Sequence, residues 1–302
     1  MQTQRVTGEA PTGLLGGDQI AAWDAMIGHS DFPRAARALA VNMLAINDAD
    51  ATLGSVFTDA GRYITAMLVG YLHGSGGMTL PRLKDACATS GFLSPGRART
   101  LLQFLRHIGY IELVQQDGRA RAGMPETYRA TPRFFTAWRA HARAALLAAE
   151  IVEPGIAGLA DRLEEPGIFE TFLQVQAAGL HEGARTADQA APIIRIFLQR
   201  YAGSQILWTL IEAGDDAVFP PADAIPVSLG AASRRFGVSH VHIRRLLNDA
   251  MAEGLLRYEA RGTVMLENSA RIALQDHYAK QLVELIASAR STLAVLRQPA
   301  AN

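Results

Sequence analysis

Two segments of this chain share one pattern, and this repeat constrains the fold more than any other feature of the sequence. Residues 79–87 can be laid over residues 228–236, and residues 94–111 over residues 239–256, after a four-residue difference in the intervening turn. Identity between the copies is low, but equivalent residue types coincide. They include Ser94 with Ser239, Arg99 with Arg244, Leu101 and Leu102 with Leu246 and Leu247, and Gly109 with Gly254. Such self-similarity predicts two copies of one supersecondary unit.

The second copy predicts two short helices followed by a hairpin. Ser228 opens the first helix, and Gly237 ends it because glycine adopts the left-handed conformation at little cost. Ser239 is placed to cap the next helix, which ends at Gly254. The alternating segments 255–259 and 263–267 predict two strands around a basic tip. Helix, tight turn, helix and hairpin is the order of a winged helix-turn-helix.

The first copy repeats this order with a longer hairpin tip. Ser94 caps a helix whose first position is Pro95, where the missing N–H costs nothing. Residues 111–115 and 127–131 are the expected strands. An apolar helical stripe precedes each copy, at 64–72 and 206–211, and a long helix follows each, at 134–150 and 272–296.

The expected fold is therefore mainly α, with small β-hairpin wings. Two tandem winged helix-turn-helix domains would share a helical core like that of a dimer, which makes the chain a pseudo-dimer. The expected organisation is a flexible tail over residues 1–18, a first domain with its flanking helices over 19–150, a linker over 151–168, and a second domain over 169–298.

Charge is distributed unevenly along the chain, although the net charge is zero. Residues 79–133 carry nine bases and four acids, and residues 228–262 carry six bases and three acids. Local charge decides which surface a polyanion approaches, so both copies are candidate nucleic-acid contacts. All but two of the basic residues in the whole chain are arginines, which suit bidentate contacts with phosphate or guanine. A GC-rich genome that prefers arginine codons is the alternative source of this bias.

Composition indicates a folded protein of the cytoplasm. Hydrophobic residues make up 49% of the chain, which argues against global disorder, yet no apolar run is long enough to span a membrane. The N-terminus lacks the pattern of a signal peptide, and the single cysteine, Cys87, excludes an internal disulfide. We therefore expect a cytoplasmic protein without a membrane partner.

At residues 239–256 the chain resembles the turn and recognition helix of bacterial winged-helix regulators. Over residues 64–150 and 205–296 it resembles two MarR-type protomers fused head to tail. Thr131, Pro132, Asp117 and Arg119 are similar to residues of MarR-type wings, whereas the second wing is shorter and Arg261 does not fit their acidic–basic pattern. The resemblance implies flanking helices that build a dimer-like core, and a small aromatic or phenolic effector bound between those helices and the winged unit. The chain would act as a monomeric pseudo-dimer or as a homodimer.

The outer faces of the second helices are the predicted sites of DNA contact. Arginine reads guanine in the major groove, and asparagine or glutamine reads adenine. Serines at helix N-termini are expected to bind phosphate through backbone N–H groups, and wing arginines to reach the minor groove. The predicted residues are Ser94, Arg97, Arg99, Thr100, Gln103, Arg119 and Arg121 in the first copy, and Ser239, His240, His242, Arg244, Arg245, Asn248 and Arg261 in the second. The alternative is that these residues are solvated outer faces of helices.

The expected function is that of a sequence-specific regulator of transcription that binds a double-stranded DNA operator. Repression is the favoured outcome, and activation stays open. The two outer faces differ, so each would read its own half-site about one helical turn (~34–36 Å) from the other. A tandem winged-helix protein–protein adaptor and a plasmid-type replication initiator are the alternatives.

We expect no enzymatic activity, catalytic residue, metal or cofactor. His240 and His242 diverge on a helix and have no nearby acidic or cysteine ligand, which argues against a metal site. Cys87 could act as a redox switch, but it aligns with Phe236 at an inner position, which favours a buried packing thiol.

Overall fold

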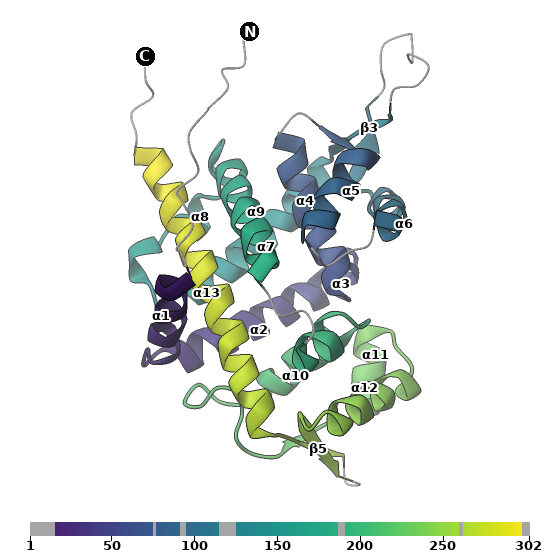
Figure 1. The fold of residues 1–302 in the computed structure, drawn as a ribbon, viewed down its shortest axis with the longest axis vertical. Helices are drawn as coiled ribbons and strands as arrows, with labels where there is room; N and C mark the ends of the chain where they lie inside the picture. Colours follow the sequence, from purple (N-terminus) through teal and green to yellow (C-terminus); the bar gives the residue numbers. More distant parts are fainter. Residues whose placement is uncertain are drawn as a thin grey trace.

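The fold is that of a computed structural model, and the residues described are 16–74, 77–90, 95–114, 125–186, 191–259 and 262–297. This part of the chain is mainly helical and contains two small three-stranded antiparallel sheets (Figure 1). The expectation of a mainly helical fold with small β elements is confirmed.

The elements of the first half begin with a helical layer. They are α1 (Gly16–Ile27), α2 (Phe32–Ala49), α3 (Ala51–Val56), α4 (Ala60–Gly74), β1 (Met78–Thr79), α5 (Leu80–Ser90), α6 (Pro95–His107), β2 (Ile111–Leu113), β3 (Thr127–Ala130) and α7 (Pro132–Ala149). Helix α1 begins inside the segment predicted as a flexible tail, two residues before its expected end.

The second half returns to the same order of elements. Its elements are η1 (Pro154–Ile156), α8 (Leu159–Arg162), α9 (Ile168–Thr186), η2 (Ile194–Leu198, a π-helical turn), α10 (Gly203–Glu212), β4 (Ile225–Pro226), α11 (Leu229–Phe236), α12 (His240–Ala252), β5 (Leu256–Glu259), β6 (Thr263–Leu266) and α13 (Asn268–Arg297). The order from α4 to α7 matches the order from α10 to α13 element by element.

The two sheets have the same topology. Their strand orders are β1-β3-β2 and β4-β6-β5. In the first sheet Ile111 pairs with Ala130, and in the second Leu256 pairs with Leu266. The edge strands β1 and β4 were not expected, because two residues carry too little alternation to predict a strand. Pro226 fits at an edge, where no ladder partner needs its missing N–H.

The C-terminal ends of α6 and α12 have the same backbone geometry. Gly109 and Gly254 have φ values of 74° and 66°, the left-handed region that glycine adopts most easily. The N–H of Tyr110 donates to the carbonyl of Leu105 (2.9 Å), and the N–H of Leu255 donates to that of Ala250 (2.9 Å). Both are the long bond of a Schellman motif, so the two helices end in the same way.

The predicted helix signals of the second copy are confirmed. The Ser228 side chain accepts from the N–H of Ala231, and Gly237 is left-handed with a φ of 63°. The Ser239 side chain accepts from the N–H of His242 (3.1 Å). These caps satisfy backbone donors that the first turn of a helix leaves unpaired.

The two halves interleave in one core. Helix α2 packs against α7 from its own half and against α10 from the second half, and α9 packs against α4 and against the long helix α13 (Figure 1). The segment 151–168, predicted as a linker, forms η1 and α8 and buries Ile156, Leu159 and Leu163 in this core. The flanking helices therefore fix the second copy against the first. In the part of the chain described, none of the helices combines the length and apolarity needed to cross a bilayer.

Candidate nucleic-acid interface

Helices α6 and α12 bury matching faces. Four apolar residues, each at its equivalent position in the repeat, are turned inward in both helices. They are Ala98, Leu101, Leu102 and Leu105 in α6, and Ile243, Leu246, Leu247 and Ala250 in α12. This spacing buries one face of a 3.6-residue helix and leaves the opposite face outward. The predicted inner faces are confirmed.

The opposite faces of both helices are exposed and polar. Three equivalent positions in each helix are exposed to solvent. They are Arg99, Thr100 and Gln103 in α6, and Arg244, Arg245 and Asn248 in α12. None of these six side chains makes a hydrogen bond or ion pair with another described residue. In Figure 1 both helices lie on the right-hand side of the molecule, α6 above α3 and α12 below it.

Two of the predicted DNA contacts are occupied within the protein. The Arg97 guanidinium lies 3.0 Å from the Asp59 carboxylate, whose side chain is only 7% exposed. His242 Nε2 lies 2.7 Å from the carbonyl oxygen of Tyr201. Positions 97 and 242 are equivalent in the repeat, so both helices use the same flank for an internal contact. These two residues hold their helices in place.

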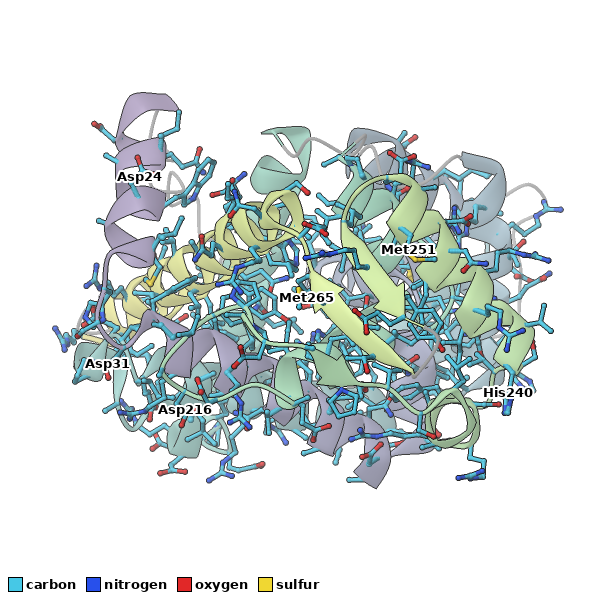
Figure 2. The ribbon with its side chains drawn as sticks, turned by 90° about the horizontal axis from the view of Figure 1, so that it is seen from below. Asp24, Asp31, Asp216, His240, Met251 and Met265 are labelled. Atoms are coloured by element: carbon cyan, nitrogen blue, oxygen red, sulfur yellow. The ribbon has the colours of Figure 1, made fainter. Side chains whose placement is uncertain are left out.

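The remaining predicted contacts lie near the ends of α12 or beyond the described residues. Ser239 caps α12 as expected, and His240 is exposed at the first position of this helix, at the end opposite Met251 (Figure 2). Ser94, Arg119, Arg121 and Arg261 lie outside the described residues.

Val241 is a candidate contact that the sequence did not single out. Its side chain is 65% exposed in the first turn of α12, on the same face as Arg245 and Asn248. An apolar side chain on such a face suits the methyl group of thymine. The inward positions of Ile243 and Leu247 in the helical pattern predict that Val241 lies outside the buried face. Within the described ranges, no three His, Cys, Asp or Glu side chains are grouped to hold a metal ion.

Several bases of the two charged segments are neutralised by neighbours. Arg235 on α11 pairs with Asp48 of α2 (2.8 Å) and Glu212 of α10 (3.0 Å), and its hydrogen bond lowers the pKa of Asp48. Arg129 pairs with Glu112 across the first hairpin (2.7 Å). Among the described residues, Arg99 of α6 and Arg244 and Arg245 of α12 form no such pair, so their charge remains available on the outward faces of these two helices.

Cys87 is a packing residue of α5, as expected from its alignment with Phe236. Its thiol is fully buried, and burial raises its pKa to about 11. Such a thiol is protonated near neutral pH, whereas reactive cysteines are exposed and ionised.

A shallow groove of about 360 Å³ lies between α2, α3 and α7. It is lined mainly by apolar side chains, including Ile46, Leu53 and Ala137, with Arg133 and Asp50 as its charged groups. No ligand is assigned to this groove, so the effector implied by the MarR resemblance stays a prediction.

Comparisons of the chain with protein-family models, with curated proteins and with solved structures gave no match. The resemblance to MarR-type regulators therefore stays a prediction.

Proposed function

We propose that this protein is a sequence-specific, double-stranded-DNA-binding regulator of transcription that uses α6 and α12 of one chain as its two recognition helices. In this proposal each repeat is a winged helix-turn-helix, and the pair forms a MarR-like pseudo-dimer. The observation that carries it is the pair of equivalent outward faces, both polar and arginine-bearing, whose six exposed side chains have no partner among the described residues. A helix of this kind fits the major groove of B-DNA.

The chemistry of the two faces supports two different half-sites. Arg99 and Gln103 suit guanine and adenine in one half-site, and the Thr100 hydroxyl can donate to or accept from a neighbouring base. Arg244, Arg245 and Asn248 suit a half-site richer in guanine, next to a thymine for Val241. A chain built in this way reads an asymmetric operator, whereas a homodimer of identical protomers reads a palindrome.

The test is enrichment of genomic duplex fragments at two salt concentrations. The wild type is compared with the double variant Arg99→Ala/Arg244→Ala and with Arg34→Ala/Arg143→Ala, which removes the same charge from exposed positions outside both helices. We expect the wild type and the control to enrich one sequence, with affinity falling steeply as salt rises. The Arg99→Ala/Arg244→Ala variant should lose this selectivity, because each bidentate guanine contact contributes about 1–3 kcal/mol of discrimination.

Two results would count against the proposal. Equal loss of selectivity in both double variants would mean that general charge drives the binding. Absence of binding even at low salt would favour the protein–protein adaptor.

A further inference from the structure

Two chain corners meet between the candidate recognition helices. The first corner, residues 57–62, joins α3 to α4, and the second corner, residues 199–203, joins η2 to α10. The backbone N–H of Ala202 donates to the carbonyl of Thr58 (2.8 Å). The guanidinium carbon of Arg62 lies 5.5 Å from the centre of the Tyr201 ring. The corners therefore form one direct contact between the two halves of the chain.

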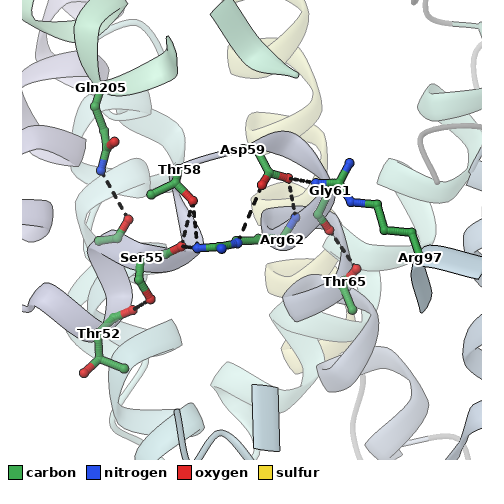
Figure 3. A network of polar contacts seen from close by, with 10 residues as sticks. Thr52, Ser55, Thr58, Asp59, Gly61, Arg62, Thr65, Arg97 and Gln205 are labelled. Atoms are coloured by element: carbon green, nitrogen blue, oxygen red, sulfur yellow. Dashed lines mark hydrogen bonds and ion pairs between the residues drawn. The ribbon is translucent and has the colours of Figure 1, made fainter. Parts of the chain in front are cut away.

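The first corner holds α6. Arg97 of α6 donates to Asp59 (3.0 Å), and the guanidinium of Arg62 lies over the ring of Phe104, 4.3 Å from its centre. Figure 3 shows Arg62 and Arg97 reaching Asp59 from opposite sides. One corner thus contacts α6 near both of its ends.

The second corner holds α12 at equivalent positions. The Tyr201 carbonyl contacts the His242 ring (2.7 Å), and Arg200 forms an ion pair with Asp249. In the repeat, position 242 corresponds to 97 and position 249 to 104. Each corner therefore contacts the same two positions of the helix that it holds.

Hydrogen bonds and backbone geometry restrict both corners to one conformation. The Asp59 carboxylate is buried and accepts from Arg97 and from the backbone N–H of Arg62 (3.0 Å), and Arg62 also donates to the carbonyl of Ser55 (2.9 Å). Breaking such a buried pair leaves a poorly compensated charge, so its geometry is strongly specified. Ala202 has a φ of 58°, an uncommon conformation for alanine that only a rigid surrounding maintains.

We infer that this corner bridge, made of Asp59, Arg62, Arg97, Tyr201 and His242, fixes α6 and α12 relative to each other. The inference rests on the proposed function for its consequence in DNA binding. A rigid bridge makes the protein accept only one spacing between its two half-sites. Arg97 and His242 are then positioning residues, and the bases are read by the outward residues of each helix.

The first measurement needs no DNA. Nitroxide labels at Thr100→Cys and Arg245→Cys report the distance between the two helices by pulsed electron–electron double resonance, and the buried Cys87 stays unlabelled. We expect one narrow distance distribution in the otherwise unchanged protein. Arg97→Gln and Arg62→Met should broaden it, Arg97→Lys should keep it narrow by retaining the ion pair, and the surface control Arg143→Gln should leave it unchanged.

Unchanged widths in folded Arg97→Gln and Arg62→Met would overturn the bridge. Thermal unfolding of each variant identifies any protein that has failed to fold. Arg97 is half exposed, so the Arg97→Gln variant keeps the measurement valid if Arg62→Met does not fold.

The second measurement varies the spacing between the enriched half-sites by one and two base pairs. The wild type should bind the wrong spacings about 10-fold more weakly or worse, because the second helix loses its contacts. Arg97→Gln should reduce this difference to about 3-fold or less while the base preference inside each half-site stays the same. A changed base preference at one position would overturn the positioning role and make Arg97 a base-contacting residue. Absence of any specific binding by the wild type would instead refute the proposed function, and the distance measurement would still decide the bridge.

Discussion

At the residue scale, the angular position of an arginine on its helix decides what it does. Arg97 and Arg99 lie two positions apart on α6, about 200° around the helix axis. Arg97 turns toward the buried carboxylate of Asp59, whereas Arg99 is exposed without a described partner. The same division separates His242 from Arg244 on α12.

Replacing each of these arginines by alanine should therefore have different effects. Arg99→Ala should lower the affinity for the enriched duplex by about 10-fold to 100-fold and leave the stability unchanged. Arg97→Ala should lower the free energy of unfolding by about 1–2 kcal/mol, because the buried carboxylate of Asp59 loses its ion pair with Arg97. Urea unfolding and fluorescence anisotropy measure the two quantities. Equal affinity losses with equal stabilities would contradict this assignment.

Cys87 should be inert in the native protein, because its buried thiol has a pKa raised to about 11. Iodoacetamide should modify it slowly at pH 7.5 and rapidly once urea unfolds the chain. The measurement is a time course by mass spectrometry at several urea concentrations. Modification of the native protein as fast as of the unfolded chain would restore the redox-switch interpretation.

At the element scale, local signals carry much of the secondary structure. The caps at Ser228, Gly237 and Ser239 and the inner faces of α6 and α12 were predictable, because each depends on residues within a few positions of one another. The corner bridge was not predictable. Asp59 lies 38 residues before Arg97, and Tyr201 lies 41 residues before His242, so only the tertiary packing brings them together. The sequence could therefore identify the outer faces, but not which of their residues were occupied internally.

The second corner should be intolerant of a larger residue at Gly203. A Cβ at this position would lie 2.4 Å from the carbonyl oxygen of Phe197, and backbone cannot move aside as a side chain can. Gly203→Ala should lower the free energy of unfolding by about 2–3 kcal/mol. The matched control is Gly179→Ala in α9, which has open space and should stabilise the protein by about 0.5–1 kcal/mol. Chemical unfolding of both variants tests the pair, and a neutral Gly203→Ala would show that the corner adapts.

At the scale of the whole molecule, a buried aromatic cluster joins the halves behind the corners. His141 of α7 contacts the rings of Phe57, Tyr63 and Trp138, and Phe57 also contacts Trp208 of α10. His141 is buried, and its Nδ1 has no hydrogen-bond partner among the described residues. Burial lowers its pKa to about 4, so the cluster contains a neutral histidine.

This histidine should make the fold sensitive to acid. Between pH 6.5 and 4 the unfolded chain binds a proton at His141 that the folded chain does not, so the free energy of unfolding falls as the pH falls. Burial raises the pKa of Glu284 to about 7, which has the opposite effect between about pH 7 and 4.5. The wild type and the His141→Phe variant both contain Glu284, so its contribution cancels in the comparison. Between pH 7 and 5 the free energy of unfolding should fall by about 2 kcal/mol less in His141→Phe than in the wild type. Urea unfolding at both pH values measures this difference, and identical pH dependence would contradict it.

The central claim is that one chain places two different recognition helices on one duplex. The most direct test is a hydroxyl-radical footprint on the enriched duplex, combined with the stoichiometry of the complex in solution. The account predicts one chain per duplex and two protected stretches of different sequence, about 10–10.5 base pairs apart from centre to centre. Arg99→Ala should weaken protection of one stretch, and Arg244→Ala that of the other. A single protected stretch, or a complex that requires two chains, would contradict the account.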